Sequence, residues 1–154
     1  RRGHIVAISA GAALGNYAGF SAYGAAKLAL EGAMESLAQE TRPFGIAVTL
    51  VQPGPFRTGF LGRSTARAAA RIDAYDATSG KFLKYLESIS GKQPGDPAGA
   101  ARAILAAVDA ERPPLRLVLG KYAVDKARRR LTTAGRELDA WAEMGASADF
   151  PAGG

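Results

Sequence analysis

The sequence contains no cysteine, only one histidine and no long apolar run. Without cysteine, the chain can form neither a disulfide framework nor a thiolate metal site, which is consistent with a cytoplasmic protein. The histidine, His4, has no Asp, Glu or Cys nearby at metal-ligand spacing, so we expect its ring to lie at the surface and to bind no metal.

Long uncharged helices are also absent. The stretch 5–30 carries only Lys27 as a charge, but glycines and polar Ser, Asn and Tyr residues interrupt it, unlike a membrane-spanning helix. We therefore expect no membrane partner. The chain begins at Arg1 rather than Met, without the apolar length and cleavage site of a secretory signal, so we expect it to be part of a longer protein.

The net charge is +6 over 154 residues, a length typical of one domain. The basic residues are scattered, and only Lys126 and 128–130 form a cluster. Such a cluster is typical of a solvated helix face, and we expect no nucleic-acid partner.

The chain alternates between short β-branched runs and helical segments. Strands are expected over 4–9, 46–51 and 115–119. Helices are expected over 21–42, with Ser21 as the cap, around 65–75, around 80–88, and after a second cap at Asp96. A last helix is expected over 121–145, where an apolar stripe includes Leu131, Leu138 and Trp141. The HIVAIS run is typical of a strand buried on both faces. Alternating units of this kind predict an α/β fold with a parallel sheet.

Three strands are few for such a sheet, because doubly wound sheets usually have five or more. The pattern predicts a Rossmann-like doubly wound sheet that is present only as its C-terminal half, filling 1–154 as part of a single domain. The stretch 57–95 has no strand signal and is expected to be a lid or substrate loop.

Tyr23 and Lys27 lie four residues apart at the start of a predicted helix, so both side chains emerge on one face. An ammonium beside a phenol favours the phenolate and lowers the tyrosine pKa from about 10. Tyr23 could then act as a general acid or base. Tyr122 and Lys126 repeat the spacing, but they lie in the charged C-terminal helix, where we interpret them as packing and solvation.

The surroundings of the first pair are more specific than its spacing. HIVAIS, a loop, YGAAKLALEG, a helix, GIAVTLVQPG and Thr58 follow one another in this order. Together they resemble the short-chain dehydrogenase/reductase family, from about Gly3 to Thr58 and more loosely afterwards.

The resemblance implies a small-molecule carbonyl or alcohol substrate and NAD or NADP as cofactor. Tyr23 would be the catalytic acid or base and would also contact the cofactor, and Lys27 would lower the pKa of Tyr23 and bind the nicotinamide ribose. Pro53, Gly54, Pro55 and Phe56 would form the wall beside the nicotinamide, and Thr58 would help to hold the cofactor. The resemblance also implies that the 21–42 helix can pack against its copy in a homo-oligomer, with Ala29, Ala33 and Leu37 as small apolar contacts.

Two features depart from the family pattern. Ala10 stands where the family has a substrate-orienting serine. Ser9 is adjacent and could replace it only through a bulge, because neighbouring strand residues face opposite ways. Asn16, Tyr17 and Ser21 are other possible donors. Moreover, no Gly-x-x-x-Gly-x-Gly turn opens the chain, so the sequence gives no choice between NAD and NADP.

These departures leave a second hypothesis, a non-catalytic relative that keeps the fold for binding or assembly. The apolar residues of the predicted lid could line a substrate pocket or simply pack: Phe60, Leu61, Phe82, Leu83, Tyr85 and Leu86.

Overall fold

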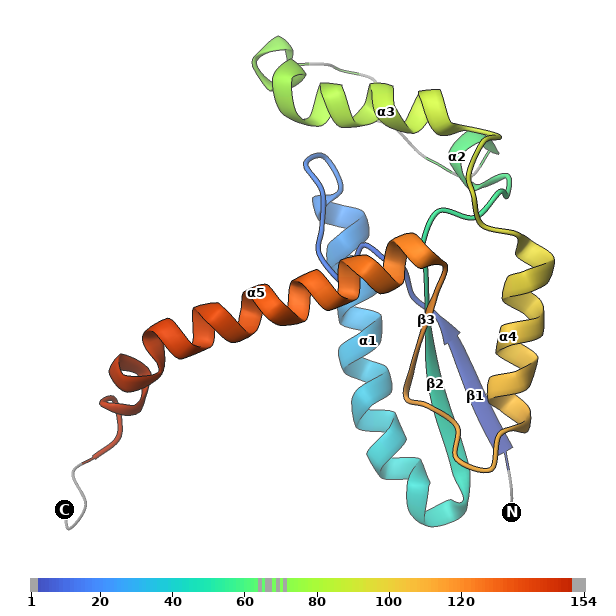
Figure 1. Ribbon diagram of the computed structural model, residues 1–154, viewed down its shortest axis with the longest axis vertical. Coiled ribbons are helices and arrows are strands. Elements are labelled where there is room, and N and C mark those ends of the chain that lie inside the picture. Colours follow the sequence, from blue (N-terminus) through green and yellow to red (C-terminus); the bar gives the residue numbers. More distant parts are fainter. Residues whose placement is uncertain (1–2, 64, 66–67, 69, 71, 151–154) are drawn as a thin grey trace.

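The computed structural model describes residues 3–63, 65, 68, 70 and 72–150. Three parallel strands form its sheet in the order β1-β2-β3: β1 (Gly3–Ile8), β2 (Ile46–Pro53) and β3 (Arg116–Leu119). Helices α1 and α4 cover opposite faces of this sheet (Figure 1). The predicted half of a Rossmann-like sheet is confirmed.

The core of the sheet is its central strand. β2 pairs with a neighbour on each edge, and Leu50 and Val51 are almost completely buried. β1 differs from the prediction, because it is not buried on both faces: Ile5 is 37% and Ile8 50% exposed. In the described part of the chain β1 pairs only with β2, so its other edge has no strand beside it.

Helix α1 (Ser21–Thr41) carries the predicted catalytic pair. The predicted cap at Ser21 is wrong: Ser21 is already the first helical residue, and Phe20 precedes it without a side-chain cap. A short 3-10 turn, Arg42–Phe44, ends the helix, and Gly45 follows with a φ of 69°, a left-handed conformation that glycine adopts without strain.

Helix α4 (Pro97–Asp109) begins as the sequence predicts. The Asp96 carboxylate accepts hydrogen bonds from the backbone N–H groups of Ala98 and Gly99, each at 2.9 Å. Pro97 occupies the first turn, where its missing N–H costs no helical hydrogen bond.

The predicted lid segment contains short helices that lie beyond the carboxyl ends of the strands (Figure 1). They are α2 (Phe60–Arg63), a 3-10 turn (Asp73–Tyr75), a π-helical turn (Asp76–Gly80) and α3 (Lys81–Ile89). α3 confirms the helix predicted around 80–88. The helix predicted around 65–75 falls partly outside the described residues, and the part described there contains only the 3-10 turn.

Helix α5 (Lys121–Ala146) confirms the predicted C-terminal helix. It starts at the sheet and projects well away from it (Figure 1). Its apolar stripe is exposed over the distal half, with Leu131, Leu138 and Trp141 each at least two-thirds exposed. Within the described residues, no helix is both long and apolar enough to cross a membrane.

Two glycines of α1 offer a matched test of how the helix start is packed. A Cβ on Gly24 would lie 2.2–2.6 Å from the side chain of Asn16, which donates a hydrogen bond to the Phe20 carbonyl. A Cβ on Gly32 would meet nothing within 4 Å. Gly32→Ala should therefore stabilise the protein by up to about 1 kcal/mol, through lower chain entropy in the unfolded state.

Gly24→Ala should be less stable than Gly32→Ala by about 1 kcal/mol or more, because Asn16 must give up its contact. Urea unfolding of both variants measures the difference. Equal effects of the two substitutions would show that Asn16 does not fix the start of α1.

Candidate active site

A cavity of about 530 Å³ lies at the carboxyl ends of the strands, where ligands of open α/β sheets bind. The loop after β1, the start of α1, the loop after β2, the lid helices and the start of α5 all border it. It gathers every residue that the sequence assigned to catalysis or to the cofactor: Ser9, Tyr23, Lys27, Pro53, Gly54, Pro55, Phe56 and Thr58.

Tyr23 and Lys27 lie one turn apart on α1 and both reach this cavity. The Lys27 ammonium lies 5.9 Å from the centre of the Tyr23 ring. It donates a hydrogen bond of 2.8 Å to the carbonyl of Ile8, the last residue of β1. The strand thus holds the ammonium beside the phenol, with other donors of the same group left over.

Burial raises the pKa of the Tyr23 phenol above its ordinary value of 10.0. This direction is opposite to the one expected from Lys27. The reason is that removing the phenol from water disfavours its charged form, whereas the ammonium is bonded to a backbone carbonyl instead of the phenol oxygen. In this structure Tyr23 is therefore a protonated phenol, the form that can donate a proton.

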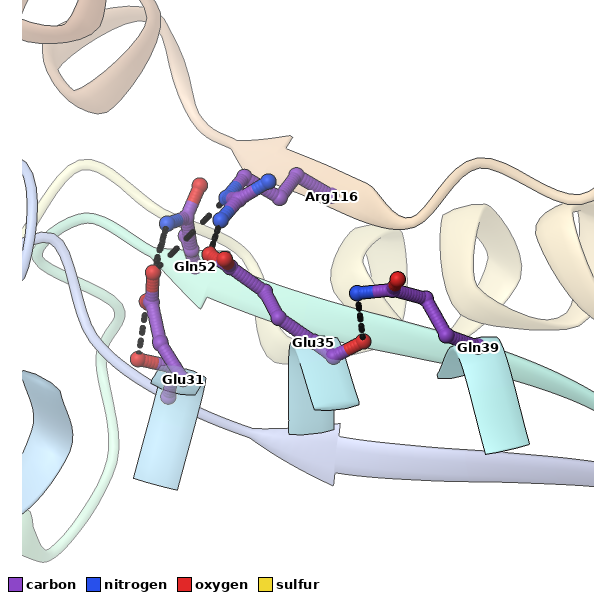
Figure 2. A network of polar contacts seen from close by, with 6 residues as sticks. Glu31, Glu35, Gln39, Gln52 and Arg116 are labelled. Carbon is purple, nitrogen blue, oxygen red and sulfur yellow. Dashed lines mark hydrogen bonds and ion pairs between the residues drawn. The ribbon is translucent and has the colours of Figure 1, made fainter. Parts of the chain in front are cut away.

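Ala10 borders the cavity and is only 6% exposed. The neighbouring Ser9 hydroxyl instead donates a 2.5 Å hydrogen bond to the buried carboxylate of Glu31. Figure 2 shows this carboxylate between α1 and the strands, with Gln52 and Arg116 beside it. Ser9 therefore has its donor committed elsewhere, and the serine replacement considered from the sequence is not what this geometry favours.

The loop after β2 is held in place by its backbone. The N–H of Gly54 donates to the Leu119 carbonyl at 2.9 Å, and that of Gly11 donates to the Pro53 carbonyl at 2.8 Å. A Cβ on Gly54 would lie 3.2 Å from the Ala123 side chain, so glycine allows the start of α5 to pack closely. The Thr58 hydroxyl accepts a bond of 3.3 Å from the N–H of Phe60.

Aromatic rings form one wall of the cavity. Tyr23 packs against Phe20 and Phe60, with ring centres 5.4 and 5.6 Å apart. Phe82 stacks on Tyr17 at 4.6 Å and meets Phe20 edge-on at 5.1 Å. A continuous apolar surface therefore extends from Tyr23 to Tyr17.

Comparisons with known proteins agree with this geometry. The family model for short chain dehydrogenases matches residues 1–69. A short-chain dehydrogenase structure from Streptomyces avermitilis superimposes with a TM-score of 0.84 at 42% identity, covering 95% of this chain and 52% of that one. The chain belongs to the short-chain dehydrogenase/reductase family.

One curated relative is Oxidoreductase BOA17 of Botryotinia fuckeliana. It is 33% identical over 94% of this chain and 52% of the relative. The 3-ketodihydrosphingosine reductase of Bacteroides thetaiotaomicron is 38% identical over 78% of this chain and 45% of the relative. Human Retinol dehydrogenase 8 is 34% identical over 75% of this chain and 39% of the relative. The chain thus spans about half the length, or less, of these relatives.

The second Tyr-Lys pair combines packing with partial exposure, as interpreted from the sequence, but its place was not foreseen. Tyr122, which is 43% exposed, and Lys126, which is half-buried, border the same cavity. The Tyr122 hydroxyl lies 2.9 Å from that of Tyr17, and the Lys126 ammonium donates to the Gly15 carbonyl. Spacing alone could not reveal this, because the contacts join residues more than a hundred positions apart.

Other candidates from the sequence lie outside the cavity lining: Asn16, Ser21 and Leu83. Tyr17, Phe60, Leu61, Phe82, Tyr85 and Leu86 do line it. His4 is half-buried instead of at the surface, and its Nε2 lies 2.8 Å from the Thr49 hydroxyl oxygen. Among the described residues, no cluster of His, Cys, Asp and Glu could hold a metal ion.

Sequence reasoning missed Gln93, which borders the cavity and is 2% exposed. Its side-chain oxygen is a buried acceptor without a hydrogen-bond partner in the described part of the chain. A buried acceptor of this kind is costly unless a donor reaches it, so a bound molecule with an N–H or O–H group would complete the site.

Burial, aided by the charge of Arg129, lowers the pKa of Lys126 to about 8 from an ordinary 10.5. The unfolded chain keeps the ordinary pKa, so between these two pH values it binds more protons than the folded chain. The free energy of unfolding should therefore gain a rising contribution as the pH increases from about 8 to about 10.

Lys126→Met should remove this contribution, so the stability difference between wild type and variant should change across that window. Lys121→Met, at an exposed lysine of the same helix, is the control for the loss of a charge alone. Urea unfolding between about pH 7 and pH 10 checks both variants. Parallel curves for wild type and Lys126→Met would contradict a partly buried ammonium.

Proposed function

We propose that the protein containing this chain is an NAD(P)-dependent oxidoreductase that exchanges hydride between nicotinamide and a carbonyl or alcohol. The observation that carries the proposal is the meeting of Tyr23, Lys27 and the 53–58 loop in one cavity at the carboxyl ends of the strands. Its family, whose relatives are named oxidoreductases and reductases, supports the same reaction class.

The residues present fit the nicotinamide end of such a cofactor. The cavity offers an ammonium with unused donors at Lys27, a tightly packed Pro-Gly loop, and an unpartnered acceptor at Gln93 that a carboxamide N–H could satisfy. Lys27, Pro53, Gly54, Pro55, Phe56 and Thr58 would hold it. When bound, nicotinamide supplies or accepts the hydride.

Tyr23 exchanges the proton in this proposal. Its raised pKa keeps the phenol protonated, which suits donation to the oxygen of a carbonyl during reduction. Lys27 holds positive charge beside the ring and so favours the phenolate that remains after the transfer.

The aromatic wall indicates an apolar substrate. Two relatives are named for retinol and for 3-ketodihydrosphingosine, which are both largely apolar molecules. Residues of the 57–95 segment line the cavity and would close over such a substrate. A homo-oligomer through the 21–42 helix stays a prediction; Ala29 and Ala33 are exposed on α1, and Leu37 is half-buried.

Ala10 favours the alternative, a non-catalytic relative that binds or assembles. The position borders the cavity but carries no hydroxyl, and the Ser9 hydroxyl donates to Glu31. The cavity lining still offers polar side chains, among them Tyr17, Tyr23, Lys27, Thr58 and Gln93. The two readings differ in whether turnover occurs at all.

Tyr23→Phe removes the proton donor and retains the ring packing. It should lower kcat by about 100-fold or more, because general acid catalysis typically contributes that much. The change in kcat is measured as turnover of an apolar aldehyde by the complete protein, with NADH and with NADPH. Tyr75→Phe is the control, because the Tyr75 ring is 59% exposed and lies outside the cavity lining. Turnover retained in Tyr23→Phe would exclude Tyr23 as the acid.

Ala10→Ser tests whether the site is a weakened enzyme. A hydroxyl at this cavity-lining position supplies a donor for the substrate oxygen and should raise kcat by about two orders of magnitude. Ala12→Ser, also buried beside the cavity, is the control for added polarity alone. No turnover in wild type and none in Ala10→Ser would favour the binding or assembly module.

A further inference from the structure

The cavity has a second polar end, formed by Tyr17, Tyr122 and Lys126. The two phenol oxygens lie 2.9 Å apart, and the Lys126 ammonium lies 3.8 Å from the centre of the Tyr17 ring. The proposed reaction uses none of these three side chains. They come from two separate segments, the loop before α1 and the first turns of α5.

The charges around the cavity are all of one sign. Of the described residues that line it, Lys27 and Lys126 are the charged ones, and no carboxylate or guanidinium is among them. Lys27 belongs to the Tyr23 end. Lys126 is therefore a cation that faces the cavity without an acidic partner in its lining, since its one recorded hydrogen bond goes to the Gly15 carbonyl.

An ammonium held in this way is poorly solvated. Burial lowers the pKa of Lys126 to about 8, which reflects the unfavourable free energy of keeping its charge away from water. Its other two N–H donors are available to acceptors, and so is the one O–H of the Tyr17 and Tyr122 pair that their mutual hydrogen bond does not use. An anion bound there would favour the charged ammonium and accept several hydrogen bonds at once.

The surface between the two ends is apolar. Phe20 contacts both Tyr23, at 5.4 Å, and Tyr17, at 6.4 Å, and Phe82 stacks on Tyr17. A ligand that spans the cavity would meet the Tyr23 phenol at one end, aromatic rings in the middle and a cation at the other end.

We propose that Lys126, together with the Tyr17 and Tyr122 hydroxyls, binds a carboxylate at the far end of an apolar substrate whose carbonyl or alcohol lies at Tyr23. The inference rests on the proposed function for the reacting end of the substrate. The substrate class is then an apolar oxo acid or hydroxy acid, with a hydrocarbon spacer between its two polar groups.

Binding tests the subsite without any turnover. Isothermal titration of the complete protein with decanoate and with decanol should show that Lys126→Met weakens decanoate binding by about tenfold or more. Decanol binding should change by less than about twofold, and Lys126→Arg should retain most of the preference for decanoate. Lys121→Met, which changes an exposed lysine five residues earlier in α5, should bind both ligands like wild type.

Kinetics then place the subsite on the substrate. Lys126→Met should raise the KM for 10-oxodecanoate by about tenfold, leaving kcat nearly unchanged and the KM for the methyl ester unaffected. An equal rise in KM for acid and ester would mean that Lys126 only stabilises the loop that contains Gly15. A weaker affinity for the cofactor alone would mean that Lys126 binds a cofactor phosphate. Either result overturns the inference.

The two proposals fail separately. Lys126-dependent binding of decanoate without turnover of any carbonyl would contradict the oxidoreductase and support the carboxylate subsite. Turnover of the methyl ester, with decanoate binding that does not depend on Lys126, would contradict the subsite and support the oxidoreductase.

Discussion

The arrangement of the whole chain depends on one buried carboxylate. Glu31 is 6% exposed on α1, and it accepts hydrogen bonds from the Ser9 hydroxyl at 2.5 Å and from the Gln52 amide at 2.8 and 2.9 Å. The Arg116 guanidinium lies 3.8 Å away and also pairs with Glu35 (Figure 2). Because these partners follow β1 or lie in β2 and β3, a single side chain connects α1 to all three strands.

The apolar residues Leu30, Met34 and Leu37 of α1 are only half-buried, so apolar packing accounts for part of the docking of this helix. Only Gly24 and Glu31 of this helix are fully buried among its residues, and Leu28 is half exposed. Glu31 lies one turn after Lys27 and two turns after Tyr23, on the same side of the helix. The carboxylate therefore fixes how far the proposed catalytic pair extends over the strand ends, and it also uses the Ser9 hydroxyl donor. The orientation of Lys27 toward the Ile8 carbonyl follows from the same docking.

The sequence was sufficient for what depends on local pattern. Alternating apolar runs and the Asp96 cap gave the strands and α4, and ordered motifs gave the family and the residues that meet in the cavity. Contacts between distant segments could not be read in this way. The Tyr122 and Lys126 pair reaches the cavity only because α5 crosses the loop before α1 (Figure 1), and Glu31 looks like an ordinary surface charge until three strands surround it. The expected burial of β1 failed because burial depends on which neighbours a strand has.

The most direct test of the role of Glu31 is the free energy of unfolding of Glu31→Ala beside Glu35→Ala, with amide hydrogen exchange of α1 recorded on both. Glu31→Ala should lose about 3 kcal/mol, since it leaves buried partners unsatisfied, and the α1 amides should lose protection. Glu35→Ala should lose less than about 1 kcal/mol, because its ion pair is exposed to solvent. Similar small losses with unchanged protection of α1 would show that packing, not this carboxylate, positions the helix.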